Sequence, residues 1–159
     1  MRRKLEGYAG LLSILLALSC GTTPAGPVAE ARRLFDRYVS LEQRYDPALV
    51  ELYADSARVK KQRRLPDGQI QYGSMSGAEL KAQIQRWTPG AVERGARNEY
   101  SAVRYQDLGN GYVRIEMRRR QLPKDLTSRQ EFIVGPGPDG RWLIWEEMAE
   151  APPLTSWRR

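Results

Sequence analysis

The chain contains no histidine and only one cysteine, and this scarcity excludes most catalytic and metal-binding chemistry. Histidine is the commonest general base near neutral pH and the commonest metal ligand. Nucleophilic sites that pair serine or cysteine with histidine are therefore excluded, as is a zinc site of the cysteine and histidine type. The glycines form neither a phosphate-binding loop nor a dinucleotide fingerprint. We expect no metal and no cofactor.

Long apolar runs are also scarce, and the one present lies at the N-terminus. Tyr8 to Leu18 carries no charge and follows the basic residues Arg2, Arg3 and Lys4. As a helix this run would be roughly 17 Å long, well short of the ~30 Å hydrocarbon core of a bilayer. The pattern predicts a secretory signal over residues 1–19 rather than a transmembrane anchor.

The single cysteine, Cys20, lies where the apolar run stops. The segment Leu16-Ala17-Leu18-Ser19-Cys20 resembles the lipobox of bacterial lipoproteins, although Ala17 stands where leucine is commonest. The resemblance implies that Cys20 is acylated and becomes the first mature residue. Residues 20–27 then form a flexible tether rich in glycine, threonine and proline. Gly21, in place of the aspartate associated with inner-membrane retention, favours an outer-membrane lipoprotein facing the periplasm.

Basic residues outnumber acidic residues in the chain, which gives a net charge of +7. Removal of residues 1–19 would take away three basic residues and one acidic residue and leave +5. The basic residues are dispersed and no nucleic-acid-binding motif accompanies them, so we expect a solvated basic surface and no nucleic-acid partner. The tail, residues 151–159, ends in Trp157, Arg158 and Arg159, which suits either a membrane interface or a frayed terminus.

The mature region, residues 28–150, alternates between helical and strand periodicity. Apolar residues at steps of three and four predict an amphipathic helix from Val28 to Tyr45, and Asp46-Pro47 opens a short second helix. Ser76 and Glu79 form a capping box for a third helix, which Thr88-Pro89-Gly90 should end.

Alternating segments predict three hairpins. The first turns at Pro66-Asp67-Gly68, the second joins 99–108 to 112–120, and the third joins 127–134 to 141–148. Helices followed by runs of strands indicate an α+β fold with an antiparallel sheet.

This order, with "LFDRYVSLEQRYDPALVELYADSARV" near the start and "GRWLIWEE" near the end, resembles the nuclear transport factor 2-like superfamily. That superfamily includes SnoaL-like polyketide cyclases and ketosteroid isomerase. The resemblance implies a cone, in which a strongly curved sheet wraps around the helices and leaves an apolar pocket at the open end.

Strand parity selects the residues of that pocket. Trp142, Ile144, Glu146 and Met148 alternate on the last strand, and the apolar members mark the core face. The same alternation places three other groups of residues each on one face of its strand. These groups are Val103 with Tyr105; Val113 with Ile115 and Met117; and Gln130 with Phe132 and Val134. The residues predicted to line the pocket are Tyr38, Trp87, Tyr105, Met117, Phe132, Trp142 and Glu146.

Two functions remain open. The first is a lipid-anchored periplasmic module that binds a hydrophobic small molecule without catalysis. The alternative is an isomerase or cyclase, in which Glu146 carries a proton and Tyr38 and Tyr105 donate hydrogen bonds to an oxyanion. A homodimer through the outer sheet face, where Leu143 and Trp145 should lie, is a further expectation.

Overall fold

The computed structural model describes residues 26–151, which begin with helix α1, Pro27–Gln43. Pro27 was assigned to the tether by sequence, but it is the first helical residue, a position that suits proline because its missing N–H has no helical partner. The helix buries one face along its length. Its buried residues are Ala31, Leu34, Phe35, Tyr38 and Leu41.

A short 3-10 helix, η1 (Pro47–Leu52), follows α1. The carboxylate of Asp46 accepts a hydrogen bond from the backbone N–H of Ala48 at 2.9 Å, as its predicted capping role requires. Strand β1 then begins at Tyr53, earlier than the sequence pattern indicated.

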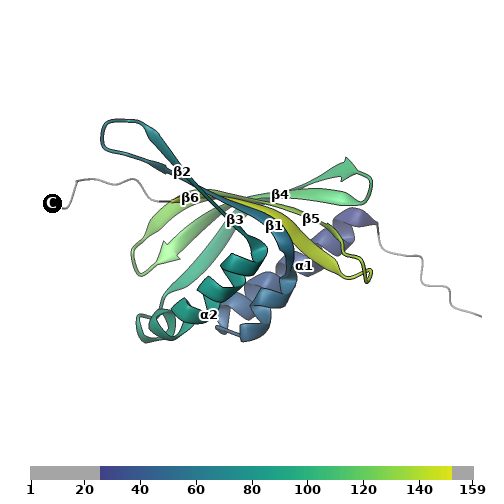
Figure 1. Ribbon diagram of the computed structural model, residues 1–159, viewed down its shortest axis with the longest axis horizontal. Helices are drawn as coiled ribbons and strands as arrows, with labels where there is room; N and C mark the ends of the chain where they lie inside the picture. Colours follow the sequence, from purple (N-terminus) through teal and green to yellow (C-terminus); the bar gives the residue numbers. More distant parts are fainter. Residues whose placement is uncertain (1–25, 152–159) are drawn as a thin grey trace, which may run out of the picture.

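Six strands form a single sheet in the order β2-β1-β6-β5-β4-β3 (Figure 1). Neighbouring strands are antiparallel except β1 and β6, which run parallel. The strands are β1 Tyr53–Arg64, β2 Ile70–Ser76, β3 Arg97–Gly109, β4 Tyr112–Leu122, β5 Leu126–Pro136 and β6 Trp142–Ala151. All three predicted hairpins are present, and the β1–β2 hairpin extends beyond the rest of the sheet (Figure 1).

Helix α2, Gly77–Glu93, begins with the predicted capping box between Ser76 and Glu79. Gly77 is required at the start, because a Cβ there would lie 1.9 Å from the carbonyl oxygen of Ala54 in β1. The prediction that Thr88-Pro89-Gly90 ends this helix is wrong, because the helix continues through Pro89 for another turn. Just before Pro89, the hydroxyl of Thr88 donates to the carbonyl of Ile84 at 2.8 Å.

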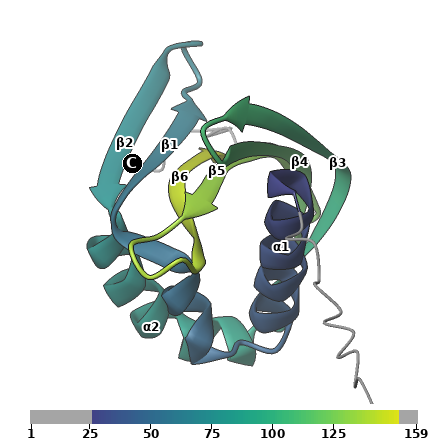
Figure 2. The same ribbon diagram turned by 90° about the vertical axis from the view of Figure 1, so that its right-hand side faces the viewer.

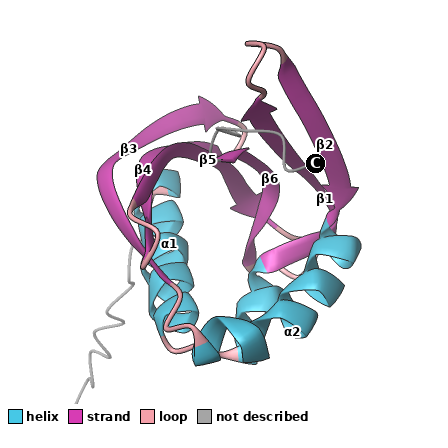
Figure 3. Ribbon diagram, turned by 90° about the vertical axis from the view of Figure 1, so that its left-hand side faces the viewer, coloured by secondary structure: helices cyan, strands magenta, loops and turns pink. Residues whose placement is uncertain are grey.

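The sheet is strongly curved and wraps around α1, while α2 packs beside the β1 end of the sheet (Figures 2 and 3). This is the predicted α+β architecture, except that the sheet is not wholly antiparallel, because β1 and β6 run parallel. Within residues 26–151, no helix combines the length and the apolar character needed to cross a membrane.

Aromatic rings fill the centre of the curved sheet. Tyr38 packs edge-on against Phe132 and Tyr100, with ring centroids 5.1 and 6.1 Å apart, and Phe35 contacts Tyr100 at 5.6 Å. Phe132 and Met117, predicted to line a pocket, are 1% and 2% exposed. The middle of the cone is therefore a packed core and not a cavity.

A β-bulge changes the parity of the last strand. Val134 pairs with Ile144, but its neighbour Ile133 pairs with Glu146, so Trp145 is an extra residue in β6. Beyond the bulge, Glu147 faces the core and is 6% exposed. Glu146 instead forms an ion pair with the exposed Arg58 of β1. The prediction that Glu146 shares the core face with Ile144 is therefore wrong.

Candidate binding site

One pocket lies where the C-terminal ends of α1 and α2 meet the start of β3 and the end of β4. It has a volume of about 570 Å³, within the usual range for small-molecule sites. We call it the helix-end pocket. Its lining residues are Glu42, Tyr45, Asp46, Leu49, Ile84, Trp87, Thr88, Ala91, Arg94, Ala96, Arg97, Asn98, Gln121, Leu122, Pro123 and Lys124.

Both helices end in left-handed backbone turns that shape this pocket. Tyr45 has a φ of 54°, and the N–H of the next residue, Asp46, donates to the carbonyl of Leu41 at 2.9 Å. Gly95 has a φ of 57°, and the N–H of Ala96 donates to the carbonyl of Ala91 at 2.9 Å. The Tyr45 hydroxyl donates to the carbonyl of Ala96 at 2.6 Å, which joins the two helix ends.

Apolar groups from several elements form the walls. Trp87 is 55% exposed, which is unusual for so large an apolar side chain, and the ammonium of Lys61 lies 5.3 Å from its ring. The apolar lining residues are Leu49, Ile84, Trp87, Ala91, Ala96, Leu122 and Pro123. These walls suit an apolar ligand.

Glu42 is among the less exposed residues that line the pocket, and we call its carboxylate the floor. Its two oxygens accept hydrogen bonds from Asn98 Nδ2 at 2.7 Å and from the Tyr100 hydroxyl at 2.8 Å. Burial raises the pKa of Glu42 above its usual value, although these two donors and Arg119 act in the opposite direction. The floor is thus a positioned acceptor that takes up a proton at a higher pH than an ordinary glutamate.

A second polar cluster lies deeper, between the sheet and α1. The carboxylate of Glu147 accepts hydrogen bonds from the Tyr53 hydroxyl at 2.8 Å and from Gln130 Nε2 at 3.0 Å. Burial, together with the carboxylates of Glu42 and Glu147, raises the pKa of Tyr38 well above its ordinary value. Tyr38 therefore stays protonated at neutral pH and lies within electrostatic range of both carboxylates.

Within the described part of the chain, three buried polar atoms of this region have no hydrogen-bond partner. They are Arg119 Nε, Ser128 Oγ and Gln130 Oε1. Buried polar atoms of this kind are commonly satisfied by ordered water.

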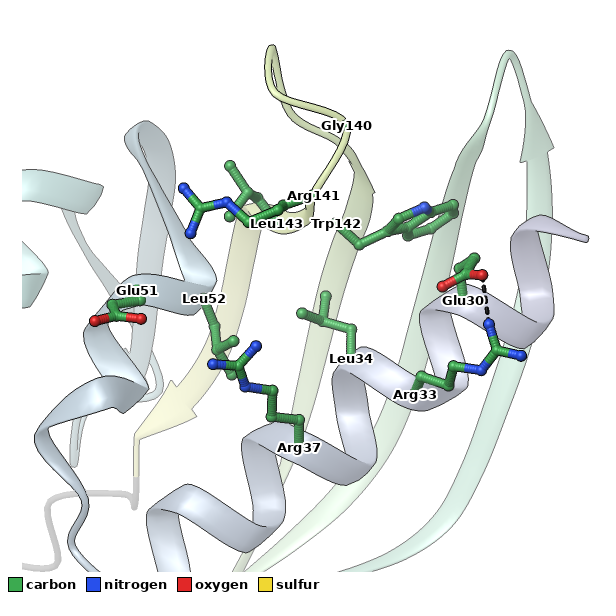
Figure 4. Close-up of a pocket in the computed structure, with 10 residues that line it drawn as sticks. All are labelled: Glu30, Arg33, Leu34, Arg37, Glu51, Leu52, Gly140, Arg141, Trp142 and Leu143. Atoms are coloured by element: carbon green, nitrogen blue, oxygen red, sulfur yellow. Dashed lines mark hydrogen bonds and ion pairs between the residues drawn. The ribbon is translucent and has the colours of Figure 1, made fainter. Parts of the chain in front are cut away.

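A smaller depression, of about 270 Å³, lies between α1, η1 and the start of β6 (Figure 4). Leu34 and Leu52 form its base, and Trp142 lies at one end. Charged side chains surround it, and Arg33 pairs with Glu30 at 2.5 Å. It is a less suitable site for an apolar molecule than the helix-end pocket.

The structure separates the residues that the sequence grouped into one pocket. Of the seven, only Trp87 lines the helix-end pocket, and Trp142 lines the smaller depression. Glu146 lies on the outer face of the sheet beside Arg58, and the ring of Tyr105 lies under the guanidinium of Arg32 at 4.6 Å. Glu146, Tyr38 and Tyr105 therefore do not form the acid–base group proposed from strand parity.

Sequence reasoning missed Glu42, Asn98, Arg97 and Lys124. For Glu42 a signal was present, because it follows Tyr38 by four residues and so lies on the apolar face of the first helix. The other three lie near strand ends, where the sequence carries no indication of a shared pocket.

Several predictions concern residues outside the described range 26–151. They are the signal peptide, the acylation of Cys20, most of the tether and the C-terminal tail.

The predicted dimer face lies within the described residues, and Leu143 and Trp145 are each partly buried there. Trp145 donates its Nε1 hydrogen to the carbonyl of Gly135 at 3.3 Å. Dimerisation stays a prediction.

Across residues 26–151, no group of three or more acidic or cysteine side chains is arranged to hold a metal ion.

No protein-family model matches this sequence, and no curated protein matches it. Solved structures do match. An NTF-2-like protein of unknown function from Shewanella oneidensis aligns with a TM-score of 0.60 at 16% identity, over 79% of this chain and 99% of that chain. The yeast UBP3-associated protein BRE5 aligns with a TM-score of 0.57 at 14% identity, over 75% and 91% of the two chains.

A domain of unknown function with a cystatin-like fold from Nostoc punctiforme aligns with a TM-score of 0.56 at 17% identity, over 81% of this chain and 78% of that chain. At these identities the similarity concerns the fold alone. The chain has the nuclear transport factor 2-like fold, also called cystatin-like, as its sequence resemblance implied.

Proposed function

We propose that this chain is a periplasmic protein, tethered to the outer membrane through acylated Cys20, that binds a small apolar molecule in the helix-end pocket without turning it over. The observation that carries the binding function is the pocket itself. It has about 570 Å³ of space, apolar walls from η1, α2, β4 and the connecting segments that hold Ala96 and Pro123, and one carboxylate, Glu42, positioned by two hydrogen bonds. Apolar walls with sparse polar groups are typical of ligand sites.

The tether rests on the sequence before Pro27. A basic start, a short apolar run and a cysteine followed by a glycine-rich and threonine-rich segment support it. Because two or more acyl chains anchor a protein stably, the domain would stay at the membrane surface with its pocket free to take up ligand.

Binding can be tested with the neutral fluorescent probe N-phenyl-1-naphthylamine. The acylated chain is reconstituted in phosphatidylcholine nanodiscs, and empty nanodiscs give the signal from lipid partition. We expect saturable fluorescence above that signal. Ala91→Phe should abolish it, because Ala91 lines the pocket, whereas Ala82→Phe places the same ring on the exposed side of α2 and should not.

A wild-type signal that equals empty nanodiscs would contradict the proposal. Equal binding by the wild type and Ala91→Phe would contradict it too, because the probe would then bind elsewhere. Circular dichroism of both variants checks that each retains the fold.

A second candidate is an acid–base enzyme, and the hydrogen-bonded carboxylate of Glu42 on the pocket floor favours it. In this case Glu42, rather than Glu146, would accept and return a proton. A screen with ketosteroids and aromatic polyketides, analysed by mass spectrometry, distinguishes the two. Turnover that vanishes in Glu42→Gln while probe binding persists would establish the enzyme and overturn the binding-only function.

A further inference from the structure

We infer that the ligand of the helix-end pocket is an apolar carboxylic acid, with its carboxylate at the exposed rim beside Arg94, Arg97 and Lys124 and its apolar body inside. This inference rests on the proposed function and adds the chemical class of the ligand.

The rim is cationic and its charges have no acidic partners. Arg94, Arg97 and Lys124 all line the pocket and are exposed, and none forms an ion pair with any residue between Gly26 and Ala151. Cations that converge on one pocket without a partner favour an anionic ligand group.

Three of the acidic residues near this rim are already engaged. Glu99 follows Asn98 of the pocket, and Asp125 follows Lys124 of the rim. Both carboxylates form ion pairs with Arg120, at 3.1 Å for Glu99 and 2.5 Å for Asp125. Asp46 caps η1 through Ala48. These carboxylates therefore do not neutralise the rim.

The floor determines the orientation of the ligand. Glu42 is less exposed than the rim cations and already accepts hydrogen bonds on both oxygens. An anion placed against this carboxylate would be repelled in a partly desolvated site. The carboxylate of the ligand is thus favoured at the rim, and the inner end is neutral or carries a hydrogen-bond donor such as a hydroxyl.

Arg94 has an additional structural role, which affects the choice of variants. It is the C-cap residue of α2, and a positive charge there stabilises the negative end of the helix dipole. Arg97 and Lys124 lie outside the helices, so Arg97→Gln with Lys124→Gln removes two rim charges without disturbing a helix end. Arg86→Gln is the matched control, because Arg86 is exposed on α2 and does not line the pocket.

The test compares 2-naphthoic acid with 2-naphthamide, which share one ring system and differ in charge. Each displaces N-phenyl-1-naphthylamine from the acylated chain in phosphatidylcholine nanodiscs. We expect the acid to bind about tenfold more tightly than the amide. The Arg97→Gln/Lys124→Gln variant should remove this difference, Arg86→Gln should retain it, and raised salt should weaken the acid alone.

Equal affinity for acid and amide, with probe binding intact, would overturn the carboxylate inference and leave the proposed function standing. Loss of saturable probe binding in the wild type would instead remove the proposed function. A further arm adds phosphatidylglycerol to the nanodiscs. If this anionic lipid displaces the probe at the rim as well as the acid does, the site recognises a membrane headgroup and the inference of a free acid is overturned.

Discussion

The hydroxyl of Tyr53 donates a hydrogen bond to Oε2 of Glu147 at 2.8 Å, although the two residues lie 94 positions apart in the chain. The bond joins β1 to β6, the one parallel pair of strands in the described sheet. Burial, and next the carboxylate of Glu147, raises the pKa of Tyr53 well above its ordinary value, so this hydroxyl remains a donor at neutral pH. The core face of the cone thus holds a carboxylate, that of Glu147, whose two oxygens each accept a hydrogen bond.

This bond predicts a large difference in stability between variants at two adjacent residues. Glu147→Ala leaves the Tyr53 hydroxyl and the Gln130 amide without their acceptor in the core, which should lower the free energy of unfolding by about 3 kcal/mol. Glu146→Ala removes only a surface ion pair and should change it by less than about 1 kcal/mol. Urea denaturation followed by circular dichroism measures both. Equal losses would show that the bulge at Trp145 does not set the parity of β6.

Glu42 predicts a specific pH dependence of stability. Because burial raises its pKa, the folded state holds this proton more tightly than the unfolded state. The contribution to the free energy of unfolding is therefore fully present below the usual value of 4.5 and is lost as pH rises through the folded-state pKa. Relative to Glu42→Gln, the wild type should lose stability over this window, as measured by urea denaturation at each pH.

Glu79 provides a control of opposite sign. The backbone N–H of Ser76 lowers the pKa of Glu79 through a hydrogen bond, so its contribution is present above the usual value and is lost as pH falls. Relative to Glu79→Gln, the wild type should lose stability in acid. If the difference in the free energy of unfolding between the wild type and Glu42→Gln does not change with pH, burial does not raise the pKa of Glu42 and this prediction is wrong.

The close approach of α2 to β1 predicts a steric effect at Gly77. In Gly77→Ala the new methyl group would lie 1.9 Å from the carbonyl oxygen of Ala54, so the helix must shift, at a cost of about 3 kcal/mol. Gly73→Ala in β2 meets no atom within 4 Å and should change the free energy of unfolding by less than about 1 kcal/mol. Thermal denaturation of the two variants compares them. A fully stable Gly77→Ala would contradict this packing of the helix start.

The predicted anchor is tested by Cys20→Ser. Without the thiol no acyl chain can be attached, so the chain should move from the detergent-extracted membrane fraction to the soluble periplasmic fraction. Immunoblots of the two fractions measure this, and mass spectrometry of the wild type should show the acyl mass. Unchanged partition in the variant, with no acyl mass on the wild type, would exclude the anchor.

Local patterns were sufficient to predict most of the elements. The apolar spacing of Phe35, Tyr38 and Leu41, the capping box of Ser76 with Glu79 and the turn at Gly109-Asn110-Gly111 each depend on neighbouring residues. They determined the α+β class and the order of helices and strands. The parity of Val113, Ile115, Met117 and Phe132 was also correct, because β4 and the middle of β5 pair without a register shift and all four are buried.

Only the tertiary structure decided which carboxylates face the interior and where the pocket lies. One extra residue at Trp145 reverses the alternation of β6, and this bulge depends on how β6 pairs with β5, which no local pattern encodes. The helix-end pocket likewise combines Glu42, Trp87, Asn98 and Lys124 from four separate segments. Their proximity follows from the packing of the two helix ends against the curved sheet. The sequence alone therefore determined the local elements, whereas the site required long-range packing.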